Sequence, residues 1–136
     1  MKIGNKITIK VIFKDKNDKI LILKKACNPS PCPICDLPGG GLEIGETFKE
    51  GIFREIKEEL NIEINVNKLE LFNNYIVERT ENYLKFLIIY SYPLTIKNIT
   101  LSSEHYDYFY ASFDELKDLR ENTVIFNIIG DYYDKN

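Results

Sequence analysis

The first part of the chain alternates apolar and polar residues with the two-residue period of a β-strand. Residues 6–13 show this alternation, and the apolar side chains that share one face are Ile7, Ile9, Val11 and Phe13. Residues 15–18 have the composition of a turn, and residues 19–25 have that of a second strand. The pattern therefore predicts a β-hairpin formed by these two strands.

A helical period begins after the glycine-rich segment 38–41, which we expect to interrupt regular structure. Residues 48–60 repeat apolar positions at about 100° per residue, and the shared face contains Ile52, Phe53, Ile56 and Leu60. Thr47 and Glu50 have the spacing of a capping box. Asn61 is typical of a helix C-cap, because asparagine tolerates the left-handed backbone conformation. A helix with both ends defined locally is predicted.

The remainder of the chain predicts three more strands and two more helices. The predicted strands span residues 63–78, 83–92 and 106–111. The predicted helices span residues 113–119 and 123–133. Strands and helices mixed in this order predict an α/β fold in which a β-sheet lies between helices.

Composition and charge exclude several classes of function. The 136 residues are 44% hydrophobic and 29% charged, which is typical of one soluble globular domain, residues 1–136. Neither a signal peptide nor a stretch able to span a membrane is evident, so we expect a cytoplasmic location without membrane association. A net charge of −3 disfavours nonspecific binding of a nucleic-acid polymer.

Positive charge is concentrated before the glycine-rich segment. Residues 2–25 contain eight lysines against two aspartates. The simpler interpretation is a set of solvated strand faces. The alternative is that Lys24 and Lys25 help to hold the phosphates of a substrate.

Three cysteines, Cys27, Cys32 and Cys35, lie within nine residues. An odd count argues against a disulfide framework. The spacing could provide three thiolates to zinc in an interaction module, but no fourth ligand is evident nearby. Reduced loop thiols, or a single disulfide that involves Cys27, are the favoured interpretations.

The predicted helix 48–60 places Glu55, Glu58 and Glu59 near one another. Three neighbouring carboxylates repel one another by a few tenths of a kcal/mol per pair. A solvated acidic face is the ordinary explanation. A hard divalent cation such as Mg²⁺ or Mn²⁺, which prefers oxygen ligands, is the functional one.

The residues around these glutamates favour the metal. Gly40 is followed after five residues by Glu46, and after seven more by the run Arg54–Ile62, Arg-Glu-Ile-Lys-Glu-Glu-Leu-Asn-Ile. This pattern resembles the Nudix box, with Asn61 in place of the final glycine. Leu-Pro-Gly-Gly before the box and Glu104-His105 after it are similar to the family as well. The resemblance implies the Nudix fold, a mixed β-sheet sandwiched between α-helices.

The resemblance also implies a site. Its metal ligands would be the Gly39 carbonyl, Glu55, Glu58, Glu59 and Glu104. Its catalytic residues would be Arg54, Glu55, Glu58 and Glu104, with the general base left open among the glutamates. Arg54 would orient carboxylates by pairing with Glu46 or with the metal ligands. Residues expected near the substrate are Lys24, Lys25, Gly40 and Glu46. For His105, a surface or packing role is favoured over a catalytic one.

The implied activity is Mg²⁺-dependent hydrolysis, with Mn²⁺ as a second metal, of a phosphoanhydride bond in a nucleoside diphosphate derivative. A (d)NTP pyrophosphohydrolase is the first candidate, and an ADP-ribose or nucleotide-sugar pyrophosphatase is the alternative. A Nudix-like domain that senses a nucleotide without cleaving it is a second alternative, although such domains usually lack box carboxylates. Homodimers are frequent in the family, so a homodimer is also an expectation. Candidates for stacking on a base are Tyr75, Phe86, Tyr108 and Phe109, with core packing as the alternative role.

Overall fold

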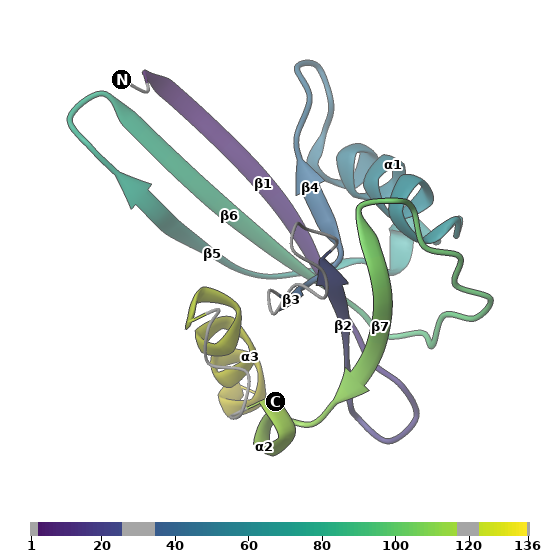
Figure 1. Ribbon diagram of the computed structural model, residues 1–136. Coiled ribbons are helices and arrows are strands. Elements are labelled where there is room, and N and C mark those ends of the chain that lie inside the picture. The colour runs from purple at the N-terminus through teal and green to yellow at the C-terminus, as the bar shows by residue number, and fades with distance from the viewer. Residues whose placement is uncertain (1–2, 26–34, 117–122, 136) are drawn as a thin grey trace.

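The computed structural model describes residues 3–25, 35–116 and 123–135 (Figure 1). The strands are β1 (Gly4–Phe13), β2 (Ile20–Lys25), β3 (Cys35–Asp36), β4 (Gly39–Gly41), β5 (Glu70–Arg79), β6 (Tyr83–Tyr92) and β7 (His105–Ala111). The helices are α1 (Phe48–Leu60), α2 (Phe113–Leu116) and α3 (Thr123–Lys135), with a 3₁₀ turn, η1 (Val66–Lys68). None of the helices in these segments is long and apolar enough to cross a membrane.

The strands form two sheets. The first is mixed and has the order β4-β1-β6-β5, in which β1 runs parallel to β6 and antiparallel to β4. The second is antiparallel and has the order β3-β2-β7. The strands β1, β6 and β5 continue as a long ribbon toward the N-terminus (Figure 1).

The predicted hairpin of residues 6–13 and 19–25 is wrong, although both strands exist. Their only ladder contact among the described residues is an isolated bridge between Lys14 and Ile20. A strand has two hydrogen-bonding edges, and β1 uses one for β4 and the other for β6. β2 pairs instead with β3 and β7 in the other sheet.

The expectation that residues 38–41 interrupt regular structure is also wrong, because Gly39–Gly41 form β4. This strand pairs with β1 in the register Ile9↔Gly40. A Cβ on Gly39, whose φ is 134°, would overlap the carbonyl oxygen of Ile9. Glycine is therefore required here for close approach of two backbones, rather than for a break.

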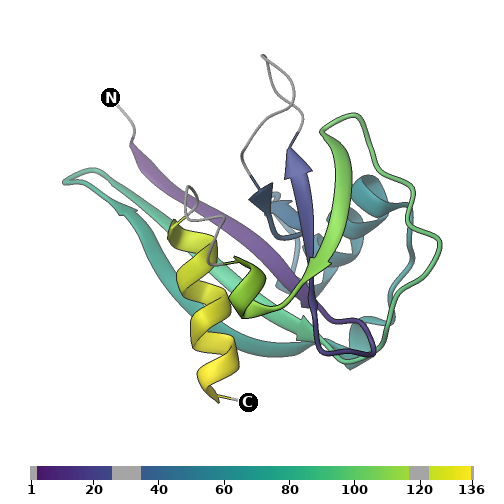
Figure 2. The same cartoon turned by 60° about the horizontal axis from the view of Figure 1, so that its bottom comes forward.

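Helices cover the sheets on opposite sides, as Figure 2 shows for α1 and α3. Alternate residues of β1 point to different cores: Val11 packs in a cluster with Ile52 and Ile56 of α1, while Ile12 packs with Ile128 of α3. The predicted shared face of β1 is confirmed, since all four of its side chains contact the α1 cluster. The predicted α/β fold, with mixed sheet between helices, is confirmed.

Local signals fixed α1 at the predicted residues. The Thr47 side chain accepts a hydrogen bond from the Glu50 backbone and the Glu50 side chain accepts one from Thr47, which completes the capping box. Asn61 ends the helix with φ 56°, in the left-handed region. Substitution of the usual glycine by asparagine therefore leaves the geometry of this helix end intact.

Other element boundaries moved by a few residues. The strand predicted from residue 63 begins only at Glu70, because η1 occupies part of the segment before it. The strand predicted over 106–111 and the C-terminal helix are confirmed, each slightly longer than expected. The short helix begins at Phe113 as predicted, and residues 117–119 lie outside the described part of the chain.

Candidate metal and nucleotide site

The candidate site lies where the last turn of α1, the strand β4 and the segment before β7 meet. The backbone N–H of Thr100 donates to the carbonyl of Leu60 at 3.0 Å, and that of Ser102 donates to the carbonyl of Glu59 at 3.0 Å. The last carbonyls of a helix have no partner within the helix. Residues 100–102 provide these partners, and this docking carries Glu104 and His105 toward the helix.

Glu59 is the most deeply buried carboxylate of the site, at 3% exposure. Its Oε1 accepts a hydrogen bond of 2.6 Å from the Gly39 backbone, which ties α1 to β4. Its Oε2 lies 3.7 Å from His105 Nδ1. Burial raises the pKa of Glu59 to about 8, even though the charge of Lys10 and the Gly39 hydrogen bond act in the opposite direction. A nearby cation would therefore favour its ionised form.

The structure brings the predicted carboxylates together. A small pocket of about 110 Å³ is lined by Glu55, Glu58, Glu59, Ser102, Ser103 and Glu104. The three helix glutamates differ in environment, since the Glu58 side chain is 60% exposed while Glu55 and Glu59 are largely covered. Glu104 comes from the loop before β7 and lines the same pocket.

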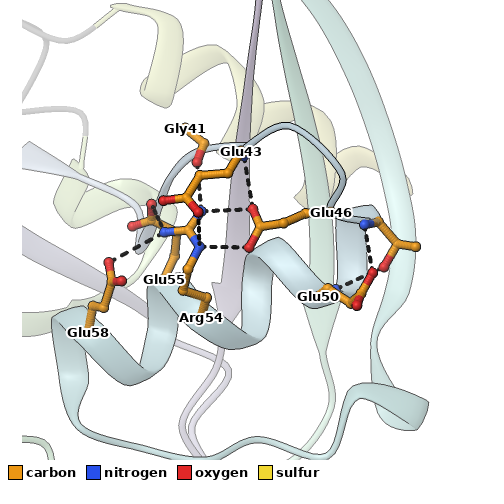
Figure 3. Close-up of polar contacts among 8 residues, drawn as sticks. Gly41, Glu43, Glu46, Glu50, Arg54, Glu55 and Glu58 are labelled. Carbon is orange, nitrogen blue, oxygen red and sulfur yellow. Dashed lines mark hydrogen bonds and ion pairs between the residues drawn. The ribbon is translucent and has the colours of Figure 1, made fainter.

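Arg54 holds the carboxylates and the glycine-rich strand in one network (Figure 3). Its guanidinium binds Glu46 through two hydrogen bonds, of 2.7 and 3.0 Å. It also donates to Glu55 Oε1 and to the Gly41 carbonyl, both at 2.9 Å. The hydrogen bond from Arg54 lowers the pKa of Glu46. The planar fork of arginine can serve these directions at once, which a lysine ammonium could not.

Glu46 and Gly40 were both expected near the substrate, but only Gly40 lines the larger cavity described below. Glu46 contacts Arg54 and the Glu43 backbone, and it is absent from the described lining of the larger cavity below. Gly40 lines that cavity and lies against Glu55, so a Cβ there would be 2.5 Å from Glu55 Oε2. The glycine therefore leaves room for this carboxylate.

A larger cavity of about 620 Å³ adjoins the carboxylates and shares Glu59 and Glu104 with the small pocket. Charged side chains of both signs line it: Lys6, Lys10, Lys25, Lys85, Asp36, Glu59, Glu78 and Glu104. Its apolar lining includes Val77, Leu87, Val124 and Ile125. The cavity thus combines positive charge with an apolar wall beside the glutamates.

The two lysines predicted to hold phosphates point in different directions. Lys25 lines the larger cavity. Lys24, which lies on the other face of β2, pairs with Asp107 at 3.9 Å and lies over the Phe109 ring at 5.3 Å. Alternation along a strand separates neighbouring side chains in this way.

Sequence reasoning missed the other cavity lysines. Lys6 of β1 and Lys85 of β6 are opposite each other in the parallel ladder. Lys10 Nζ donates to Asp36 Oδ2 at 3.0 Å and to the Gly39 carbonyl at 3.1 Å. That carbonyl, a predicted metal ligand, is therefore engaged by an ammonium group in this structure. The pairing of β1 with β4 and with β6 places these lysines at the site, and no local pattern reveals that pairing.

For His105 a surface or packing role was favoured over a catalytic one, and the structure buries it at the edge of the larger cavity. Its side chain is 7% exposed, and Nδ1 has no hydrogen-bond partner among the described residues. Burial lowers the pKa of His105, so the imidazole is neutral near pH 7. The adjacent Glu104 was the one signal that could have identified it.

The remaining candidates lie elsewhere. Within the described residues, none of the four aromatic side chains proposed for base stacking lines the larger cavity. Tyr75, for example, donates to Asp131 of α3 at 2.8 Å. Cys35 is buried in β3, whereas Cys27 and Cys32 lie outside the described residues.

Comparison with known proteins gives a consistent picture. Over 48 residues, 35% of this chain and 28% of the relative, the sequence is 46% identical to the ADP-ribose pyrophosphatase of Methanocaldococcus jannaschii. Over 51 residues, 38% of this chain and 40% of the relative, it is 34% identical to the 8-oxo-dGTP diphosphatase of Escherichia coli. These matches span well under two thirds of either curated relative.

Similarity of fold extends much further than these local matches. The crystal structure of the MutT protein from Methanosarcina mazei Go1 aligns with 99% of this chain and 96% of its own, with a TM-score of 0.76 and 20% identity. A family model described as NUDIX domain matches residues 4–129. The chain therefore belongs to the Nudix family.

Proposed function

We propose that the chain is a divalent-metal-dependent hydrolase that cleaves a phosphoanhydride bond in a nucleoside diphosphate derivative. The observation that carries this proposal is the convergence of the box glutamates and Glu104 on one pocket, which adjoins a cavity lined by lysines. Carboxylates can hold the metal, and lysines can hold phosphates.

The donor set fits a hard cation. Glu55, Glu58, Glu59 and Glu104 offer only oxygen atoms, which Mg²⁺ and Mn²⁺ prefer. Burial of Glu59 disfavours its charged form even with Lys10 nearby, and a bound cation would offset this cost. When bound, Mg²⁺ or Mn²⁺ would supply neutralisation of phosphate charge and a more acidic water molecule.

The chain's own residues have separable tasks in this proposal. Arg54 fixes the orientation of Glu55 and of the β4 backbone. Lys6, Lys25 and Lys85 attract the negatively charged substrate. A glutamate of the small pocket accepts the proton of the attacking water. Water is the nucleophile, and no covalent enzyme intermediate is required.

Two substrate classes are supported to different degrees. A cavity of about 620 Å³ lies within the usual range of roughly 300–1,000 Å³ for small-molecule sites and suits one nucleotide. Our first candidate remains a (d)NTP, cleaved to a nucleoside monophosphate and pyrophosphate, in keeping with the relative named 8-oxo-dGTP diphosphatase. ADP-ribose is the second candidate, favoured by the 46% local identity to an ADP-ribose pyrophosphatase.

The test is a substrate screen with product identification. Purified protein with Mg²⁺ or Mn²⁺ would be given canonical and 8-oxo (d)NTPs, ADP-ribose and a nucleotide sugar. Release of pyrophosphate identifies the first class, and release of AMP with ribose phosphate identifies the second. Glu58→Gln and Glu59→Gln are each expected to lower turnover by about two orders of magnitude or more while leaving the circular-dichroism spectrum unchanged.

Glu63→Gln is the matched control, because Glu63 follows the same helix and pairs with the exposed Lys57 away from the pocket. It should retain wild-type turnover. Tight nucleotide binding without turnover in either metal would instead indicate a sensing domain. Wild-type rates in both box variants would contradict the assigned site.

A further inference from the structure

We propose that His105 is a nitrogen ligand of a divalent cation held together with Glu59 and Glu104, and that it makes this site bind Mn²⁺ in preference to Mg²⁺. The inference rests on the proposed metal dependence and extends it. An all-oxygen set does not by itself favour Mn²⁺ strongly, whereas an imidazole nitrogen suits transition metals better than Mg²⁺.

The geometry of the three side chains is close to that of a ligand set. One ligand atom from each of Glu59, Glu104 and His105 lies within 4.8 Å of the other two. The Glu59 Oε2 to His105 Nδ1 distance is 3.7 Å. Bonds of about 2.1 Å place two ligand atoms roughly 3 to 4 Å apart. Glu104 is exposed at the end of its loop, so a small movement of its side chain completes the set.

An independent observation comes from the imidazole itself. His105 Nδ1 is buried and has no hydrogen-bond partner among the described residues. Leaving a buried polar atom unsatisfied costs about 1–3 kcal/mol. The ring lines the larger cavity beside the glutamates, where a cation would satisfy this nitrogen.

Backbone contacts hold His105 in place. Its N–H points to the Ser102 carbonyl at 3.4 Å, and the residue pairs with Lys25 of β2 at the start of β7. The Ser102 backbone is itself bonded to the end of α1. The ring and Glu59 are therefore positioned by the same docked segment before any ligand arrives.

The surrounding charges permit a divalent cation. The ligand set combines two carboxylates, of Glu59 and Glu104, with one imidazole. Lys10 is a nearby ammonium, but Asp36 and the Gly39 carbonyl bind its Nζ at 3.0 and 3.1 Å. Lys25 also lines the cavity and is exposed.

The experiment is pulsed electron paramagnetic resonance of Mn²⁺ added below one equivalent to the untagged full chain. Because the sequence contains a single histidine, ¹⁵N-histidine labelling marks one imidazole only. We expect ¹⁴N modulation of the Mn²⁺ signal in unlabelled protein and its replacement by ¹⁵N coupling in labelled protein. This measurement needs no mutation, so a folding defect cannot obscure it.

Calorimetry of His105→Gln provides the second measurement, after its fold is checked by circular dichroism. We expect the Kd for Mn²⁺ to rise about tenfold or more, and the Kd for Mg²⁺ to change less than threefold. Glu63→Gln should leave both constants unchanged.

Mn²⁺ bound without nitrogen coupling overturns this inference, and so does an absence of Mn²⁺ binding. The proposed function is judged separately. Metal-dependent hydrolysis by a protein whose bound Mn²⁺ shows only oxygen ligands would keep the hydrolase and remove His105 from the ligand set. Absence of hydrolysis with any divalent metal would remove the hydrolase.

Discussion

At the scale of single residues, Glu59 combines two properties that oppose each other in the metal-free protein. Its side chain fastens α1 to β4 through the Gly39 N–H, yet burial disfavours its charge. Because the ionisation of this buried carboxylate is unfavourable in the folded protein, the free energy of unfolding depends on pH. The direction of that dependence follows from the raised pKa.

We predict that Glu59→Gln becomes increasingly more stable than wild type as pH rises from about 5 to 8 in the presence of a chelator. The pKa of Glu59 in the folded protein, about 8, lies above the ordinary value of 4.5. The wild type therefore loses no stability from this group below pH 4.5 and loses progressively more as pH rises toward 8. The difference in unfolding free energy should grow by at most about 1.4 kcal/mol per pH unit. Urea unfolding at several pH values measures it.

The exposed variant Glu63→Gln serves as the control and should follow the wild-type curve at every pH. Parallel curves for wild type and Glu59→Gln would show that burial does not perturb this carboxyl. Excess Mg²⁺ should narrow the difference at high pH, because only the wild type retains the anionic ligand.

At the scale of elements, β4 consists of three glycines that face three different environments. A Cβ on Gly39 would meet the backbone of β1, one on Gly40 would meet the Glu55 carboxylate, and one on Gly41 would come no closer than 3.9 Å to Lys6 Cε. Gly39 is therefore needed for folding, whereas Gly40 is needed for the position of the Glu55 carboxylate in the site. Successive substitutions should distinguish these two requirements.

We predict three distinct outcomes for alanine along β4. Gly39→Ala should unfold at markedly lower temperature, because the new methyl group meets backbone that cannot move away and φ is positive. Gly40→Ala should remain folded but lose most of its metal affinity and turnover, because Glu55 must shift. Gly41→Ala should resemble wild type in both. Thermal unfolding and metal titration of the three variants would decide, and equal behaviour of the first two would contradict the assignment.

The helix and the strands differ in how far the sequence alone predicted them. Periodicity, a capping box and a C-cap asparagine are all local signals. The bounds of α1, and the closeness of its glutamates to one another, could therefore be predicted from the sequence. Strand pairing is nonlocal, which is why the hairpin was wrong and β4 was missed. Lys6 and Lys85 were missed for the same reason, since each reaches the site only through tertiary structure.

At the scale of the whole molecule, segments far apart in the chain together line one cavity that carries both lysines and glutamates. Glutamates come from α1 and from the loop before β7, whereas Lys6 and Lys85 come from the paired strands β1 and β6. Neither of these two lysines forms an ion pair within the described structure. Their charges are therefore available to an anionic substrate.

We predict that Lys6→Ala and Lys85→Ala raise KM for the polyphosphate substrate by about threefold to tenfold each, with little change in kcat. Loss of an attractive charge weakens binding of ground state and transition state alike. The effect should diminish as salt concentration rises, because screening weakens the same attraction in the wild type. Steady-state kinetics at low and high salt measure it.

Lys97→Ala is the control, since Lys97 is exposed on the long loop outside the cavity. It should leave KM unchanged. A fall in kcat at constant KM in the cavity variants would mean that these lysines act on the reacting atoms rather than on capture of the substrate.

The parallel pairing of β1 with β6 has a consequence for synthesis of the protein. Residues 4–13 leave the ribosome well before their ladder partner, residues 83–92. Until β6 is synthesised, the apolar residues of β1 remain unpaired on that edge and can bind chaperones or associate with other chains. β1 is thus synthesised long before it can gain its full set of contacts.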